Sequence, residues 1–185
     1  MANTKISAMT NASALGGTEQ LAGVQSGANV NVTPSQIKTF TTVGTSTNDN
    51  AAAGSVGEYV SSNIATGSAV SLTTTTTANV TSVSLTAGDW DVWGAVAFKP
   101  GGTTSLTVLN ASVSTTSATN GALNAGSFAQ WATAANVVGA NDVYLTLAPA
   151  RISLAGTTTV YLTATGTFSV STLAAYGILQ ARRRR

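Results

Sequence analysis

The chain has 185 residues, which suits one domain with an appendage or two small domains, and its 43% apolar content is enough for a hydrophobic core although only 8% of the residues are charged. Four of its eight basic residues are the arginines at positions 182–185, so the other four basic and six acidic residues give the rest of the chain a net charge of −2, which argues against a broad basic surface for nucleic acid. The chain has no His and no Cys, which excludes Ser-His-Asp triads, Cys-His pairs and a disulfide framework.

Residues 1–45 differ from the rest of the chain and predict an extended N-terminal arm. Their apolar side chains are widely spaced among Asn, Thr, Gly and Ser, which favours neither a strong strand nor a long helix. Thr33 and Pro34 can begin a helix of one or two turns over residues 33–38. We expect the arm to become ordered by docking on another protein. The side chains expected to anchor it are Ile6, Met9, Leu15, Leu21, Val24 and Ile37.

Residues 46–57 are mostly Ser, Thr, Asn, Ala and Gly, with one acidic residue, Asp49, and predict a flexible linker. From residue 58 onward one strand signal follows another. The chain contains 32 Thr and 20 Ser, and β-branched residues such as Thr and Val favour pleated sheet over helix. The first three strands are predicted at residues 58–64, 68–74 and 79–85.

The clearest strand signal lies at residues 89–98, where side chains alternate with the period of two that a sheet requires. One face is predicted to hold Trp90, Val92, Gly94, Val96 and Phe98, and the other Asp91, Trp93, Ala95 and Ala97. Residues 105–115 predict a partner strand. Residues 119–141 contain several glycines and predict a long exposed loop with a short strand. Further strands are predicted at residues 142–147, 150–154, 158–168 and 173–181.

Eight or nine short strands with regular turns predict an all-β fold, an antiparallel β-sandwich of the jelly-roll kind over residues 58–185. In the strands at 89–98 and 173–181 neither face is clearly polar, whereas the sandwich of a monomer shows one solvated face. We therefore expect outer strand faces to be buried between the subunits of a homotrimer. The predicted interface residues are Trp90, Trp93, Tyr161 and Tyr176.

Asp89 and Asp91 are the one pair of carboxylates close together in the sequence. On a strand they share a face at roughly 6.5–7 Å, a spacing that suits a glycosidase pair or part of a calcium site. No third carboxylate or supporting base lies nearby in the sequence, so a turn and hydrogen bonding at a strand edge or subunit interface are favoured. We expect no enzymatic activity, no metal and no cofactor.

The aromatic residues suggest a second kind of site, a surface that stacks on sugars. Trp90 and Trp93 have opposite parity, so one regular strand cannot present both on one face. Core or interface packing is favoured for these two residues. The candidates for an exposed glycan-binding loop are Phe128 and Trp131, and Tyr144 joins them as an exposed aromatic.

The arginines at 182–185 form the one concentrated run of charge in the chain. Such a run can bind nucleic acid. Nothing else in the sequence supports that role, because no basic stripe accompanies it. We expect the run to pack against a neighbouring chain or the surface of a larger assembly, or to be solvated, and we expect no nucleic-acid partner.

Four segments near the N-terminus carry a resemblance to a known protein family. They are residues 2–12 (ANTKISAMTNA), 15–20 (LGGTEQ), 24–27 (VQSG) and 32–37 (VTPSQI). Together they resemble the N-terminal segment of many bacteriophage tail-fibre, head-fibre and other appendage proteins. The resemblance implies that residues 1–45 attach the protein to the major capsid protein or another virion protein.

The body of the chain also resembles a group of small structural proteins of bacteriophages and prophages. The similar segments are residues 83–92 (VSLTAGDWDV), 151–154 (RISL), 158–162 (TTVYL), 175–177 (AYG) and 181–183 (ARR). The resemblance implies a virion component with a β-sandwich knob, usually trimeric. It leaves open whether the component belongs to the head or the tail.

The sequence thus predicts a capsid decoration (cement) protein or a short head fibre, because 185 residues leave no room for a long shaft after the arm. A small tail or baseplate appendage, or a module that binds a host receptor glycan, is the alternative. A depolymerase would depend on Asp89 and Asp91. The sequence shows no signal peptide and no transmembrane run, so we expect assembly in the bacterial cytoplasm, no membrane partner, and a final location in the virion.

Overall fold

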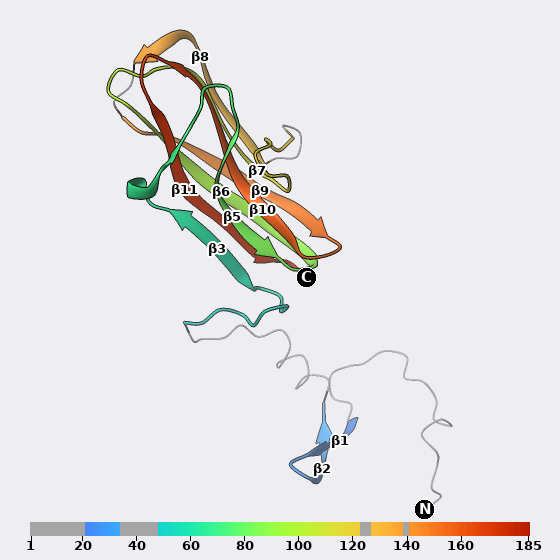
Figure 1. Cartoon of the computed structure of the whole chain (residues 1–185). Helices are drawn as coiled ribbons and strands as arrows, with labels where there is room; N and C mark the ends of the chain where they lie inside the picture. The colour runs from blue at the N-terminus through green and yellow to red at the C-terminus, as the bar shows by residue number, and fades with distance from the viewer. Residues whose placement is uncertain (1–20, 34–47, 123–126, 139–140) are drawn as a thin grey trace, which may run out of the picture. The chain divides into compact units, whose positions relative to one another are not determined.

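The computed structural model describes residues 21–33, 48–122, 127–138 and 141–185 (Figure 1). The chain divides into two compact units, Met1–Asp49 and Asn50–Arg185. Within the described residues the regular elements are strands, apart from one short 3-10 helix, which confirms the predicted all-β class. In this part of the chain no helix has the length and apolar character needed to cross a membrane.

The first unit contains a β-hairpin of two five-residue strands, β1 (Leu21–Gln25) and β2 (Ala28–Val32). Its two-residue turn has positive φ at both positions, 50° at Ser26 and 80° at Gly27, as a type I′ turn requires. The wide spacing of apolar residues predicted no strong strand here, and that prediction is wrong, because the Ser-Gly pair forms the turn of a hairpin. The anchoring candidates Leu21 and Val24 lie on β1. The other anchoring candidates lie outside the described residues; they are Ile6, Met9, Leu15 and Ile37. Residues 34–38 of the predicted helical turn lie outside them as well.

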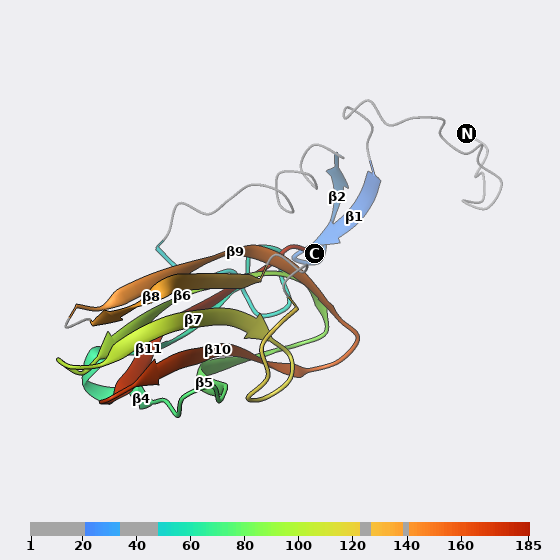
Figure 2. The same cartoon turned by 90° about the horizontal axis from the view of Figure 1, so that it is seen from above.

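The second unit is a sandwich of two antiparallel sheets (Figures 1 and 2). The first sheet has the order β5 (Ala78–Leu85), β10 (Thr158–Ser169), β7 (Ser105–Ser114), β8 (Phe128–Val138). The second has the order β3 (Tyr59–Ile64), β11 (Leu173–Arg183), β6 (Gly88–Pro100), β9 (Val143–Leu154). The short strand β4 (Val70–Ser71) also pairs with β11, and the 3-10 helix η2 (Thr66–Ser68) precedes it.

The strands of the sandwich pair in a nested order along the chain. β3 pairs with β11, β5 with β10, β6 with β9, and β7 with β8, all antiparallel. This nesting is the strand order of a jelly roll. The predicted antiparallel sandwich is therefore confirmed.

Two predicted elements differ from the structure. The separate strands expected at 142–147 and 150–154 form one strand, β9, with a bulge in which Ala148 and Pro149 lie opposite Trp93. Proline has no backbone N–H, and a bulge on an edge strand tolerates it. The loop expected at 119–141 contains an eleven-residue edge strand, β8, which pairs with β7.

The core lies between the two sheets. As the alternation predicted, one face of β6 is buried there, and Trp90, Val92, Val96 and Phe98 have no exposed surface. Close packing of such side chains supplies most of the stability of a domain of this size. The opposite sheet contributes mainly Leu85, Leu106, Leu109, Val160 and Leu162.

A polar loop after β7 covers part of the outer face of the first sheet. Asn79 on β5 bonds to this loop twice, accepting from the Ala118 N–H and donating to Ser117 Oγ, each at 2.8 Å. Asn120 Nδ2 donates to Thr165 Oγ1 on β10 at 3.0 Å. The outward-facing hydroxyls beneath the loop are thereby buried and hydrogen-bonded, which explains why Thr and Ser can occupy these strand positions.

Candidate functional site

The outer face of the second sheet carries four aromatic side chains that the core does not use. We call this surface the outer aromatic face; it comprises Tyr59, Trp93, Ala95, Ala97, Tyr144, Tyr176 and Ile178. These residues come from all four main strands of the sheet, and the pairing of the strands places them side by side. The face contains two of the predicted interface residues, Trp93 and Tyr176.

One half of the face is a small cluster across β3, β11 and β6. The rings of Tyr59 and Trp93 lie 6.4 Å apart between centroids and are tilted by 46°. Gln180 lies between them on β11, and its Nε2 donates to Tyr59 Oη at 2.6 Å. An aromatic pair fixed by a hydrogen bond in this way is a rigid contact surface.

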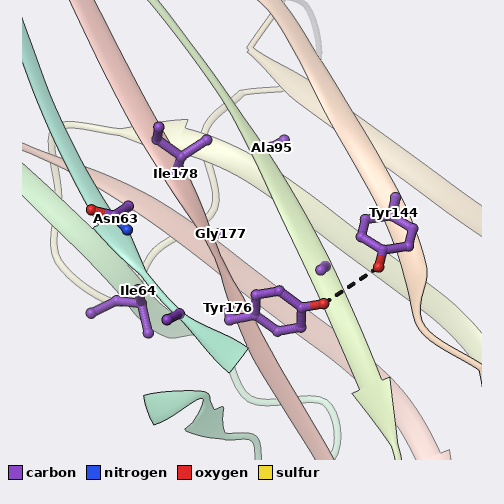
Figure 3. A pocket seen from close by; sticks show the side chains of 9 residues that line it. Asn63, Ile64, Ala95, Tyr144, Tyr176, Gly177 and Ile178 are labelled. Atoms are coloured by element: carbon purple, nitrogen blue, oxygen red, sulfur yellow. Dashed lines mark hydrogen bonds between the residues drawn. The ribbon is translucent and has the colours of Figure 1, made fainter. Parts of the chain in front are cut away.

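The other half is a pair of tyrosines that point toward one another across β6 (Figure 3). The Tyr176 hydroxyl donates to Asp142 Oδ2 at 2.5 Å and lies 3.4 Å from the Tyr144 hydroxyl. The hydrogen bond to Asp142, with a further contribution from Tyr144, raises the pKa of Tyr176 well above its usual range. The phenol of Tyr176 is therefore held in place and neutral, while the side chain of Tyr144 is 67% exposed.

Beside these tyrosines the sheet has a shallow hollow of about 330 Å³. Its floor contains Ala95, Ala97 and Gly177, whose small side chains leave space above the strands. A β-carbon at Gly177 would collide with the carbonyl oxygen of Ala95, so the close approach of β11 to β6 requires glycine there. The rim includes Asn63 and Ile178 (Figure 3). Six of the nine lining residues are Ala, Gly or Ile, so the hollow is suited to an apolar group.

The end of the sheet nearest the C-terminus is charged. The carboxylate of Asp89 accepts from Arg151 Nε at 2.6 Å and lies 3.0 Å from Arg185 Nε. Asp91 lies 3.3 Å from Arg184 Nη1. The hydrogen bond from Arg151 holds the pKa of Asp89 below its usual range. The general acid of a glycosidase needs a raised pKa, so this environment does not suit Asp89 to that role.

Arg183 is buried with 5% exposure, although it belongs to the terminal arginine run. Its Nε donates to Glu58 Oε2 at 2.7 Å, its Nη1 donates to the Ala87 carbonyl at 2.9 Å, and its guanidinium lies 4.3 Å from the ring centroid of Trp90. Its Nη2 also donates to the Thr86 hydroxyl. The guanidinium therefore joins the start of β3, the β5–β6 turn and the core.

The terminal run is thus part of the fold. β11 continues to Arg183, two residues beyond the predicted end, and three of the four arginines form ion pairs with carboxylates of the same chain. The expectation that the run packs on another chain or is simply solvated is wrong for Arg183, which is buried within its own chain. It stays a prediction for Arg184 and Arg185, whose side chains are 59% and 75% exposed. The side chain of Arg182 is exposed. Three or more acidic residues grouped as for a metal ion do not occur in the described part of the chain.

The structure corrects several predicted site residues. Trp90 is wholly buried inside its own chain, so it cannot form a subunit interface. Trp131 lies on β8 and packs half-buried against the core, and is not on an exposed loop. Phe128 begins the same strand opposite Ser112 and is also half-buried. Tyr161 lies half-buried on the outer face of the first sheet, away from Trp93 and Tyr176, and its place in a subunit interface stays a prediction.

Several residues of the outer aromatic face were not among the predicted site residues. Tyr59 and Ile178 are among them. Ile178 could have been predicted, because residues two apart on a strand lie on the same face and Ile178 follows Tyr176 by two. The pairing of β11 with both β3 and β6 could not be deduced from the sequence, and it is this pairing that places Tyr59 beside Trp93.

Comparisons with known proteins identify no family. No protein-family model and no curated protein matches the chain. A structure of infectious bursal disease virus, Gx strain, matches with 11% identity and a TM-score of 0.37, covering 69% of this chain and 30% of its own. The Gt strain matches with 15% identity and a TM-score of 0.33 at the same coverage. The chain therefore spans less than a third of the length of these viral chains, and similarity of this degree establishes no relationship.

Proposed function

We propose that the chain is a structural protein of a bacteriophage particle, a capsid decoration (cement) protein or short head fibre. The observation that carries the proposal is the division into two compact units at Asp49 and Asn50. The first unit contains the segments that resemble phage attachment sequences, and the second is a jelly-roll sandwich. In this proposal the first unit binds the major capsid protein or another virion protein, and the jelly roll is the knob.

The outer aromatic face supports the further proposal that the knob is a homotrimer. Trp93, Tyr176 and Ile178 lie on the outside of the sandwich, where a monomer would present polar side chains to water. Aromatic residues are enriched where protein surfaces meet. A trimer would bury this face between neighbouring knobs.

The proposal is tested with particles of the phage whose genome encodes the chain. Particles made without the gene are mixed with purified full-length protein and then separated from unbound protein by gradient centrifugation. We expect saturable binding, and we expect the loaded shells to release DNA at a higher temperature than the unloaded shells. Failure of the full-length protein to bind, and its absence from wild-type particles by mass spectrometry, would refute a virion role.

A receptor-binding function is the second candidate, because the exposed ring of Tyr144 beside the hollow can stack on a sugar. Binding of purified host surface polysaccharide to the full-length protein tests it by calorimetry. For a decoration protein we expect no heat of binding. Binding that is lost in Tyr144→Ala, together with labelling of the tail in electron micrographs, would favour the receptor-binding appendage.

A further inference from the structure

The turn between β10 and β11 exposes a strained apolar residue. Val170 has a φ of 76°, a conformation that β-branched residues rarely adopt, and its side chain is 81% exposed. Asn or Gly would tolerate this backbone far better, and a polar residue would be better solvated. A residue that opposes both local preferences indicates a function outside the turn itself.

The hollow on the outer aromatic face is apolar and therefore suits an apolar side chain such as that of Val170. Its floor of Ala95, Ala97 and Gly177 is apolar, and about 330 Å³ is ample for an aliphatic side chain. The Tyr176 hydroxyl is already bonded to Asp142, so it adds little hydrogen-bonding capacity for a sugar. The turn at residues 169–172 carries no charge, and the nine residues that line the hollow carry none either.

Both features lie near the same end of the sandwich. Leu173, three residues after Val170, pairs with Pro100, while Tyr176 at the hollow pairs with Ala97. The hollow therefore begins about 10 Å along β11 from Leu173, in the half of the sheet next to the turn. A contact between two different surfaces of the same chain is heterologous, and it forms a ring when the rotation that relates neighbouring copies closes.

We propose that the occupant of the hollow is Val170 of a second copy of this chain. Each knob inserts its β10–β11 turn into the hollow of the next knob, and three such contacts close the trimer. The inference rests on the proposed trimer and adds its contact residues. The neighbouring pair of Tyr59 and Trp93 extends the buried surface beyond the inserted side chain.

The first test is the mass of the full-length protein by light scattering across a dilution series. We expect a three-chain mass for the wild type. Val170→Asn keeps a residue that accepts positive φ but removes the apolar side chain, so each contact should weaken roughly ten-fold or more and trimers should dissociate at higher concentration. The melting temperature of the dissociated chain should stay equal or rise, which excludes misfolding as the cause.

Val56→Asn is the matched control, because Val56 is also highly exposed, at 71%, and precedes β3 at the opposite end of the knob. It should leave the trimer unchanged. A wild type that stays a single chain at high concentration, or a Val170→Asn variant that dissociates like the wild type, would overturn the inference. Neither result affects the particle-binding test, so the virion role is judged separately.

A second test uses the absence of Cys from the chain. Full-length Val170→Cys and Asn63→Cys proteins are prepared separately, and Asn63 lies on the rim of the hollow. After the two are mixed and mildly oxidised, we expect disulfide-linked pairs that contain one chain of each variant, with far fewer links in either variant alone. Links formed mainly by Val170→Cys with itself would show a symmetrical contact and contradict insertion into the hollow.

Discussion

At the scale of single residues, Arg183 shows how a charged side chain can be accommodated in a sandwich. Its guanidinium has a carboxylate, a carbonyl and a hydroxyl as acceptors, and the indole of Trp90 beneath it. The planar group with five donors suits such a site, which the single ammonium of lysine would not fill. The arginine is thereby a structural connection between the two ends of the knob sequence.

We predict that Arg183→Ala destabilises the protein by about 3 kcal/mol, because one partner of a buried ion pair is removed and Glu58 loses its counter-charge. Arg182→Ala is the control, since its side chain is exposed, and should change the free energy of unfolding by less than about 0.5 kcal/mol. Urea unfolding at pH 7 measures both. Equal midpoints for the two variants would show that the Arg183 contacts do not stabilise the fold.

The same arginines predict how stability depends on pH. Bonds from Arg183 and from the Gly54 N–H lower the pKa of Glu58, and the bond from Arg151 lowers that of Asp89. Carboxylates with a lowered folded-state pKa stabilise fully above their unfolded values of about 4.3 and 3.9, and this contribution is lost as the pH falls below them. The urea midpoint should therefore be level from pH 7 to about pH 5 and then decrease. The variant Glu58→Gln with Asp89→Asn should show a shallower decrease, and an unchanged slope would contradict this assignment.

At the scale of elements, the loop after β7 stabilises the first sheet through polar contacts. Asn120 accepts from Thr165 Oγ1 at 3.2 Å and donates to the same hydroxyl at 3.0 Å, and the Gly121 N–H donates to Ser112 Oγ at 2.8 Å. Ser112 and Thr163 beneath it are fully buried. Buried hydroxyls that lose their partners cost free energy, so the loop and the strands depend on one another.

We predict that Asn120→Leu destabilises the protein by about 1–3 kcal/mol, the cost of leaving buried polar groups unpaired. Thr119→Ala, an exposed neighbour, should have little effect. Hydrogen exchange gives the more specific measurement, because amides of residues 115–121 should exchange faster in Asn120→Leu while those of β6 keep their protection. Uniform loss of protection across both sheets would show that the loop unfolds only with the whole domain.

Some strands were predicted accurately from the sequence and others were not. The alternation in 89–98 is strong, and both the strand and its buried face were predicted. The signal failed for β8, where small polar residues and glycines around Phe128 and Trp131 are typical of a loop, and the pairing with β7 decides the outcome. It also failed at Pro149, since proline interrupts the strand pattern although the bulge accommodates it. The burial of Arg183 was not predicted, because a charged residue is expected on the surface. Its position on β11, on the same face as the buried Leu179 and Ala181, indicated the opposite.

At the scale of the whole molecule, the sequence predicted the sandwich and the unusually apolar outer face of its second sheet. It could not predict the hollow, because Ala95, Ala97 and Gly177 become neighbours of Tyr144 only through the register of three strands. The part of the predicted linker next to the knob is likewise held by hydrogen bonds to residues distant in the sequence, which the sequence could not predict. Asn50 Nδ2 donates to the Tyr59 carbonyl at 3.1 Å, and the Gly57 N–H donates to the Arg183 carbonyl at 3.0 Å.

These contacts lead to a prediction about where the knob begins. A fragment of residues 50–185 keeps the bonds of Asn50, Gly54 and Gly57, so it should fold with the unfolding midpoint of the full chain. A fragment of residues 58–185 loses all three and should be less stable by about 2–4 kcal/mol, since one of them is made to the carboxylate of Glu58. Circular dichroism during urea unfolding measures both. Equal stability of the two fragments would mean that residues 50–57 act only as a linker, and a longer fragment that fails to fold would mean that the first unit is needed to form the jelly roll.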